Sequence, residues 1–183
     1  MAMTRPPDDA ALEALARRLG ELLRERQWRL ATAESSTGGL IGHAITMIPG
    51  ASDYYAGGAI CYSNLAKEKE LGVPAALIAE HGAVSTEVAA AMAEGAWRRF
   101  SVDVGVSVTG IAGPEGGTAE KPVGLHFIGV ARIGHPPVVE RHQFGFDRDG
   151  NRSGAAACAM PTSRFGESFV VATNSSRNST NAL

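Results

Sequence analysis

The stretch Thr32-Ala33-Glu34-Ser35-Ser36-Thr37-Gly38-Gly39 joins a short apolar segment to an apolar helical pattern that runs from Leu40 to Ile45. Hydroxyl side chains followed by two glycines predict a turn from a strand into a helix. A helix N-terminus offers free N–H groups and favours negative charge, and glycine lets a ligand approach the backbone. The stretch therefore predicts a phosphate site or a serine nucleophile. A helix cap with permissive glycines is the simpler alternative.

Apolar periodicity and turn residues on both sides of this stretch predict alternating helices and strands. Helices are expected after the acidic pair Asp8-Asp9 and over 38–47, 64–71, 75–80 and 86–100, and strands over 29–33, 57–62, 102–108, 125–133 and 138–146. The last two strands are expected to form a hairpin through 134–137. This order predicts an α/β protein, a three-layer α/β/α sandwich with a mixed β-sheet.

Composition narrows the classes of function. The length of 183 residues is typical of one domain. A net charge of −2 does not give the positive surface potential that attracts nucleic acid. Cys61 and Cys158 fit no disulfide or zinc pattern, and no histidines have HxxxH spacing, so no metal site is expected. No segment predicts a membrane span or a signal peptide. We expect a cytoplasmic protein that acts on a small molecule, with no nucleic-acid or membrane partner.

Three parts of the chain differ in character. Residues 1–9 form an N-terminal arm, residues 10–152 form the domain, and residues 153–183 are rich in Ser, Thr and Asn. A short helix over 155–160, ended by Pro161, and a short strand over 165–172 are the most structure expected in the last part. Its polar end is expected to be disordered.

The segment Tyr62-Ser63-Asn64-Leu65-Ala66-Lys67 is expected where a strand ends and a helix begins. Lys67 then lies in the first helical turn, where the helix dipole opposes its charge. That field makes a neutral, basic lysine easier to reach. The alternative is a helix capped by Ser63 or Asn64 and a solvated lysine.

Two more segments precede strands or helices. In His81-Gly82-Ala83-Val84-Ser85, a cap for the helix near Thr86 is the favoured interpretation of Ser85. The glycine-rich segment 109–124 lacks the phosphate-loop and dinucleotide patterns. A connection of this length inside a domain predicts a ligand loop, and Lys121 is its candidate phosphate ligand.

The motifs TAESSTGG, YSNLAK, HGAVS and TGIAGPEGGTAEKPVG occur in this order over about residues 10–152. Together they resemble the CinA C-terminal domain family, whose enzymatic members are nicotinamide-nucleotide amidohydrolases. The resemblance implies an α/β/α fold and no metal or organic cofactor. It also implies hydrolysis of the carboxamide of nicotinamide mononucleotide to nicotinate mononucleotide and ammonia, in pyridine nucleotide salvage.

The resemblance implies Ser35 as the nucleophile, assisted by Tyr62 and Lys67. The chemistry agrees, because Lys67, when desolvated, is able to take the Ser35 proton and pass it to ammonia. Tyr62 is an alternative base or relay, and the sequence does not choose between them. Backbone N–H groups of Thr37 and Gly38 are expected to hold the oxyanion.

The loop 110–117 and Lys121 are expected to hold the ribose phosphate of the substrate. The full predicted substrate-binding set is Glu34, Thr37, Gly38, Gly39, Ser85, Thr109, Gly110, Gly113, Gly116, Gly117 and Lys121. A nucleotide ligand and a homo-oligomer are the expected partners. Two other classes of function stay open: a nucleotide-binding regulator of the CinA (competence/damage-inducible) type without catalysis, and a serine amidase that acts on a peptide or another small amide.

The sequence departs from the family at three points. Ser36 stands where the family often has cysteine. Many relatives carry an N-terminal molybdopterin-binding-like domain, which this chain is too short to hold, so pyrophosphatase activity is not expected. The family continues beyond the run 147–152 into an amphipathic C-terminal helix, and residues 153–183 do not have that pattern.

Overall fold

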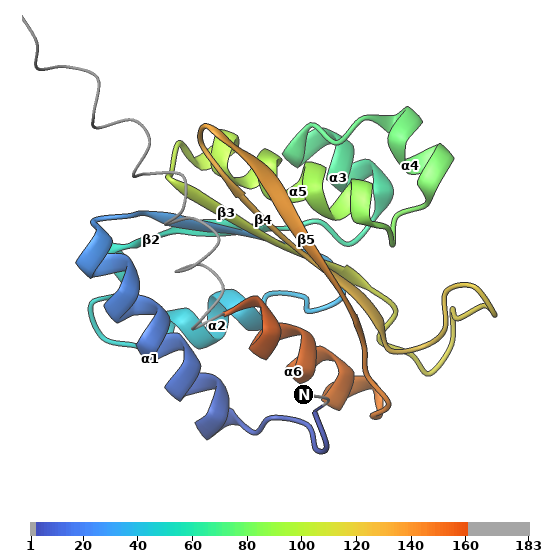
Figure 1. The fold of residues 1–183 in the computed structure, drawn as a ribbon, viewed down its shortest axis with the longest axis horizontal. Helices are drawn as coiled ribbons and strands as arrows, with labels where there is room; N and C mark the ends of the chain where they lie inside the picture. The colour runs from blue at the N-terminus through green and yellow to red at the C-terminus, as the bar shows by residue number, and fades with distance from the viewer. Residues whose placement is uncertain (1–2, 161–183) are drawn as a thin grey trace, which may run out of the picture.

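A five-stranded mixed sheet lies at the centre of the computed structural model, which describes residues 3–160 (Figure 1). The strands are β1 (Leu30–Glu34), β2 (Tyr55–Ile60), β3 (Val104–Gly110), β4 (Leu125–Arg132) and β5 (His135–Gln143), in the order β2-β1-β3-β4-β5. β1 pairs in parallel with both β2 and β3, and the hairpin β4–β5 continues the sheet in antiparallel pairing.

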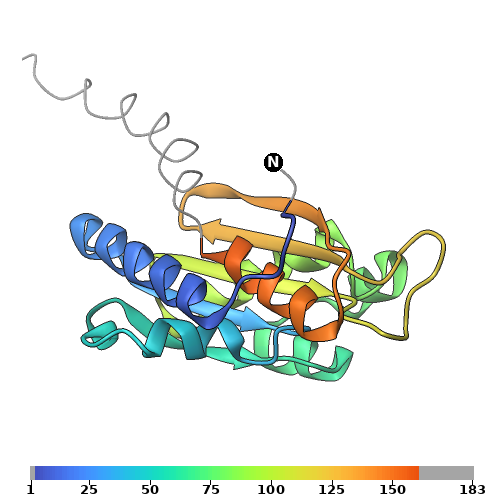
Figure 2. The ribbon, with the colours of Figure 1, turned by 90° about the horizontal axis from the view of Figure 1, so that it is seen from below.

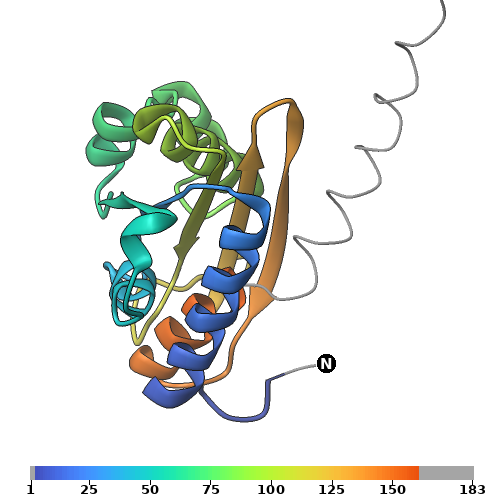
Figure 3. The same cartoon turned by 90° about the vertical axis from the view of Figure 1, so that its left-hand side faces the viewer.

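Helices cover both faces of the sheet (Figures 1 and 3). One layer holds α1 (Asp9–Arg26), α2 (Leu40–Thr46) and α6 (Arg148–Ala159), and the other holds α3 (Asn64–Leu71), α4 (Ala75–His81) and α5 (Thr86–Phe100). A short 3-10 turn, Ala51–Asp53, precedes β2. The three-layer α/β/α architecture with a mixed sheet, predicted from the order of elements, is confirmed.

Alternation along β3 divides the interior into two cores. Val104, Val106 and Val108 are buried against the layer of α1, α2 and α6. Gly105 faces α5, where an added Cβ would lie 2.0 Å from the carbonyl oxygen of Ala93. Because glycine has no Cβ, α5 packs directly against the backbone of the central strand.

Helix α5 has the bounds that the sequence predicts. Ser85 caps it by accepting a hydrogen bond from the backbone N–H of Val88 at 3.3 Å, and Arg98 and Arg99 lie in its last turn. The hairpin is confirmed, but β5 begins at His135, within the segment expected to connect the two strands. Prolines within 135–143 are tolerated because β5 is an edge strand.

The short helix expected over 155–160 belongs to a longer helix that begins at Arg148 and ends at Ala159. Helix α6 runs through the expected boundary at residue 152 and packs in the same layer as α1 and α2. Its buried face consists of small residues, including Gly154, Ala155 and Ala156, which carry little apolar signal in the sequence. An added Cβ at Gly154 would lie 3.0 Å from the ring of Phe144, so small residues allow a close approach. The strand and the disordered end expected after Pro161 lie outside the described residues.

The two crossover connections among the parallel strands lie on opposite faces of the sheet. The chain passes from β1 to β2 through α2 on one face, and from β2 to β3 through α3, α4 and α5 on the other (Figure 1). In open α/β sheets, ligands bind beyond the carboxyl ends of strands at such a point. Ser35 follows β1, Tyr62 follows β2 by two residues, and the loop 111–124 follows β3.

Candidate active site

Glu34, the last residue of β1, organises the turn that carries Ser35. Its carboxylate accepts hydrogen bonds from the backbone N–H groups of Gly39 at 2.9 Å, Ile41 at 3.1 Å and Gly42 at 2.8 Å. Gly38 and Gly39 have positive φ angles of 63° and 100°, which glycine adopts most readily. The free N–H groups at the start of α2 therefore bond the Glu34 carboxylate, and the two glycines allow the backbone conformation of the turn.

Ser35 and Lys67 form a buried pair at the end of the parallel strands. The Ser35 N–H donates to the carbonyl of Val108 at 3.0 Å, which extends the pairing of β1 with β3 to the serine. Lys67 Nζ donates to Ser35 Oγ at 3.1 Å. Only 7% of Ser35 and 1% of Lys67 are exposed, so both residues are largely shielded from solvent.

Lys67 reaches the serine from the first turn of α3, which Ser63 caps. Its Nζ also donates to the carbonyls of Cys61 at 3.0 Å and Tyr62 at 3.4 Å. Burial lowers the pKa of Lys67 below its ordinary value, because the apolar surroundings disfavour an ammonium; a negative charge at Cys61 would act in the opposite sense and more weakly. The lysine is thus held within hydrogen-bond reach of Ser35 in surroundings that favour its neutral form more than water does.

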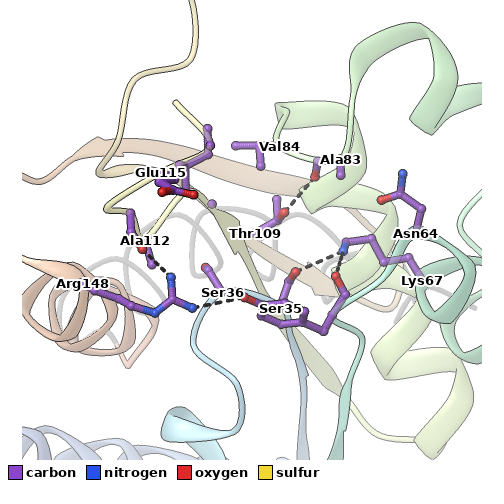
Figure 4. Close-up of a pocket in the computed structure, with 15 residues that line it drawn as sticks. Ser35, Ser36, Asn64, Lys67, Ala83, Val84, Thr109, Ala112, Glu115 and Arg148 are labelled. Carbon is purple, nitrogen blue, oxygen red and sulfur yellow. Dashed lines mark hydrogen bonds between the residues drawn. The ribbon is translucent and has the colours of Figure 1, made fainter. Parts of the chain in front are cut away.

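A cavity of about 280 Å³ opens over this pair (Figure 4). Ser35, Ser36, Tyr62 and Lys67 line one part of it, and the loop after β3 lines the other. Figure 4 shows Ser35 and Lys67 on one side and Arg148 on the opposite side. The cavity thus has the serine–lysine pair in one part of its wall and a guanidinium in another.

Arg148 is the functional candidate that sequence reasoning missed. It lies in the first turn of α6, where its Nη1 donates to the carbonyl of Gly113 and its Nη2 donates to the Tyr62 hydroxyl at 3.2 Å. The available signal was the run 147–152, in which an N-cap aspartate precedes basic residues four positions apart. Only the folded chain places this helix beside the cavity.

The predicted substrate-binding residues divide into two groups. Four of them line the cavity: Thr109, Gly110, Gly113 and Gly116. The others are not among its lining residues: Glu34, Thr37, Gly38, Gly39, Ser85, Gly117 and Lys121. The structure therefore brings the end of β3 and the first part of the glycine-rich loop to Ser35, and it leaves the second part of that loop outside (Figures 1 and 2).

Several residues of the second group have structural partners. Lys121 Nζ donates to the carbonyl of His81 at 2.6 Å and ties the loop to the end of α4. Ser85 Oγ donates to the carbonyl of Gly82 at 2.9 Å in addition to capping α5. The Gly38 N–H donates to the carbonyl of Ser35 at 3.1 Å within the turn.

The residues that the structure describes also bear on two other features, metal-binding clusters and membrane-spanning helices. Over residues 3–160, no three side chains among His, Cys, Asp and Glu gather in a way that would hold a metal ion. In the same part of the chain, no helix combines the length and the hydropathy that crossing a bilayer requires.

Fold and site together define an α/β/α protein whose cavity lies at the ends of parallel strands and is lined by a buried serine–lysine pair. The sequence model of the CinA C-terminal domain family matches residues 12–164. The chain belongs to the CinA C-terminal domain family, as the four motifs predict.

Named relatives agree with this assignment. A CinA-like protein of Salinibacter ruber is 49% identical over 156 residues, which cover 85% of this chain and 37% of the relative. A putative competence-damage inducible protein of Halothermothrix orenii is 53% identical over 134 residues, which cover 73% of this chain and 32% of the relative. The chain thus spans about a third of the length of these curated relatives.

Solved structures share the whole architecture. The crystal structure of the competence/damage inducible protein CihA from Agrobacterium tumefaciens has a TM-score of 0.80 and 36% identity, covering 94% of this chain and 99% of that chain. A CinA superfamily protein from Klebsiella pneumoniae has a TM-score of 0.78 and 32% identity, covering 81% of this chain and 92% of that chain.

Proposed function

We propose that this chain hydrolyses the carboxamide of nicotinamide mononucleotide to nicotinate mononucleotide and ammonia, with Ser35 as the nucleophile. The observation that carries the proposal is the buried contact of 3.1 Å between Ser35 Oγ and Lys67 Nζ in the wall of a cavity. A serine within hydrogen-bond reach of a tuned base is the arrangement that nucleophilic catalysis requires. Family membership supports the choice of a nucleotide amide as substrate.

The neighbours of Lys67 support its role as the base. The carbonyls of Cys61 and Tyr62 accept from Nζ, so in the neutral amine they take its two N–H groups and leave the lone pair directed at Ser35 Oγ. The lowered pKa of Lys67 increases the fraction in this neutral form. Tyr62, by contrast, bonds Arg148 through its hydroxyl. We therefore assign proton transfer to Lys67.

The first half of the reaction forms an ester. Ser35 Oγ attacks the carboxamide carbon while its proton passes to Lys67 Nζ. The tetrahedral intermediate then collapses, the C–N bond breaks, and Lys67 returns the proton to the leaving nitrogen. Ammonia departs, and the nicotinoyl group stays on Ser35 as an ester.

The second half consumes water. Lys67 takes a proton from a water molecule whose oxygen attacks the ester carbon. The bond between that carbon and Ser35 Oγ breaks, and Lys67 returns the proton to the serine oxygen. The product acid ionises to the nicotinate carboxylate, so the sum is one amide and one water converted to one acid and one ammonia.

The oxyanion of both intermediates requires donors near Ser35. Gly38 bonds the carbonyl of Ser35 through its N–H. The N–H groups of Ser36 and Thr37 make no backbone hydrogen bond within residues 3–160. Ser36 lines the cavity and directly follows the nucleophile, a position that supplies oxyanion donors in other hydrolases. We assign this role to the Ser36 N–H, in place of Gly38.

The phosphate of the substrate needs a cation at the other end of the cavity. Arg148 lines the cavity opposite Lys67 (Figure 4), and a guanidinium is suited to pairing with phosphate oxygens. Lys121 is the candidate from the sequence, but it does not line the cavity, and its ammonium bonds the His81 carbonyl instead. We therefore assign the phosphate to Arg148.

Ammonia release from nicotinamide mononucleotide tests the proposal. The wild-type chain should release ammonia and nicotinate mononucleotide in equal amounts, and Ser35→Ala should lose at least about a thousandfold in kcat. Ser153→Ala is the matched control, because its hydroxyl bonds the Asp149 carbonyl within α6. Wild-type turnover in Ser35→Ala would exclude this nucleophile.

The same experiment separates the other two classes of function. Calorimetric binding of nicotinamide mononucleotide by a folded wild-type chain that releases no ammonia would support a regulator. Turnover of simple amides without turnover of the nucleotide would support a different serine amidase. A cytoplasmic location and a homo-oligomer stay predictions.

A further inference from the structure

Three side chains of α6 donate hydrogen bonds to backbone carbonyls in two segments beside the cavity, the turn after Ser35 and the glycine-rich loop after β3. Arg148, Asn151 and Arg152 lie on one helical face, because positions three and four apart are neighbours on a helix. Their acceptors are the carbonyls of Gly113 and Ala112 in the glycine-rich loop and of Thr37 in the turn after Ser35. One helix face is thus bonded to both walls of the site.

Arg152 acts on the wall that carries the nucleophile. Its Nη2 donates to the Thr37 carbonyl at 2.9 Å. That carbonyl shares a peptide plane with the N–H of Gly38, which donates to the carbonyl of Ser35 at 3.1 Å. A peptide group is planar, so fixing the Thr37 oxygen also fixes the direction of the N–H that bonds the residue carrying the nucleophile.

Asn151 acts on the opposite wall. Its side chain is fully buried, its amide nitrogen donates to the Ala112 carbonyl at 3.0 Å, and its amide oxygen accepts from the N–H of Phe146 at 3.1 Å. Both ends of the amide are bonded, which fixes its orientation. Ala112 precedes Gly113, whose carbonyl accepts from Arg148, so Asn151 holds the loop that Arg148 contacts.

We propose that Arg152 and Asn151 are positioning residues with separate effects: Arg152 sets the attack geometry of Ser35, and Asn151 sets the loop that binds the substrate. The inference rests on the proposed function, because it names how that site is held. Arg152 does not line the cavity, so it acts through the turn rather than on the substrate. Its loss changes kcat, whereas loss of the Asn151 amide changes KM.

Steady-state kinetics with nicotinamide mononucleotide test this separation. Arg152→Met removes the donor and should lower kcat roughly tenfold to a hundredfold, the effect of a misplacement of about 1 Å, with KM within about twofold. Arg152→Lys keeps a donor and should recover part of the kcat. Asn151→Asp keeps the acceptor for Phe146 N–H but loses the donor to Ala112, and it should raise KM about tenfold or more with a smaller change in kcat. Ser153→Ala is the matched control on the same helix.

Labelling of Ser35 by a fluorophosphonate probe gives a readout that does not depend on the nucleotide. Arg152→Met should label more slowly than wild type, and Arg152→Lys should be intermediate, at thermal midpoints close to that of the wild type. If the wild type releases no ammonia, the proposed function fails, and labelling still tests Arg152. The inference would be overturned if a folded Arg152→Met had the labelling rate and the kcat of the wild type. It would also be overturned if the Arg152 and Asn151 variants changed kcat and KM in the same way.

Discussion

Lys67 Nζ reaches Ser35 Oγ at 3.1 Å across 32 residues of sequence. The contact follows from the pairing of β1 with β2: Glu34 lies opposite Ile60 in the parallel register, so the residues after the two strands emerge side by side. The first turn of α3 then directs the lysine back over the end of β1. The pair is held by strand register and by a capped helix, and its chemistry leads to the first two predictions.

Activity should rise with pH through the pKa of Lys67. The base must be neutral, so kcat/KM should fall about tenfold for each pH unit below this pKa and reach a plateau above it. Burial lowers the pKa of Lys67, so the rise should lie well below the ordinary lysine value of about 10.4. A pH profile of kcat/KM with nicotinamide mononucleotide checks this. A rise only near the ordinary lysine value would contradict the role of Lys67.

Lys67→Met should abolish turnover and make the protein more stable at low pH. Because the pKa of Lys67 is lower in the folded chain, the unfolded chain binds more protons between the two pKa values, and the free energy of unfolding rises with pH there. The free energy of unfolding of the wild type is therefore lowest, relative to that of Lys67→Met, at pH values below the lowered pKa. Denaturant unfolding across pH should show the gap between the two proteins narrowing as pH rises. A gap independent of pH would argue against a buried, tuned lysine.

Arg148→Ala should raise KM for nicotinamide mononucleotide about tenfold to a hundredfold, because hydrogen bonds to charged groups contribute roughly 1.5–3 kcal/mol. Nicotinamide riboside lacks the phosphate, so its kinetics should change much less. Lys121→Ala is the informative comparison: its ammonium bonds the His81 carbonyl, so the variant should affect both substrates alike. A phosphate-dependent loss in Lys121→Ala and not in Arg148→Ala would reverse the assignment.

Glu34→Gln should destabilise the fold by about 1–3 kcal/mol, because a buried acceptor for three backbone N–H groups is replaced by an amide that turns a donor toward one of them. Denaturant unfolding measures the change. Glu13→Gln is the matched control: Glu13 forms an exposed pair with Arg17 on α1, and such pairs contribute little. Equal stability of the Glu34 and Glu13 variants would refute the structural role of Glu34.

The sequence predicts those parts of the fold and of the candidate site that depend on patterns of residues close together in the chain. Helix α5 has a capping serine at its start and arginines in its last turn, and both of its ends are predicted. Ser35, Tyr62 and Lys67 were predicted to meet because each motif follows the carboxyl end of a predicted strand, and the cavity contains all three.

The rest of the site depends on contacts distant in sequence. Arg148 approaches Tyr62 across 86 residues and Arg152 approaches Thr37 across 115, and no local pattern encodes such contacts. Of helix α6, the sequence predicts only the short part over 155–160, because glycine and alanine make up most of its buried face and carry little apolar signal. Lys121 was assigned to phosphate because a long loop has no periodicity that would show which way its side chains point.

If the proposed function holds, the carboxylate at the start of α2 influences the orientation in which the substrate binds. Glu34 takes the backbone N–H groups of Gly39, Ile41 and Gly42, the donors that an incoming phosphate would otherwise seek beside Ser35. In the proposed function, the amide end of the substrate then lies at Ser35, where these donors are already taken, and the phosphate end lies at Arg148, which lines the cavity opposite Lys67 (Figure 4). If the proposed function holds, this arrangement favours one orientation, in which the amide of the substrate reaches Ser35.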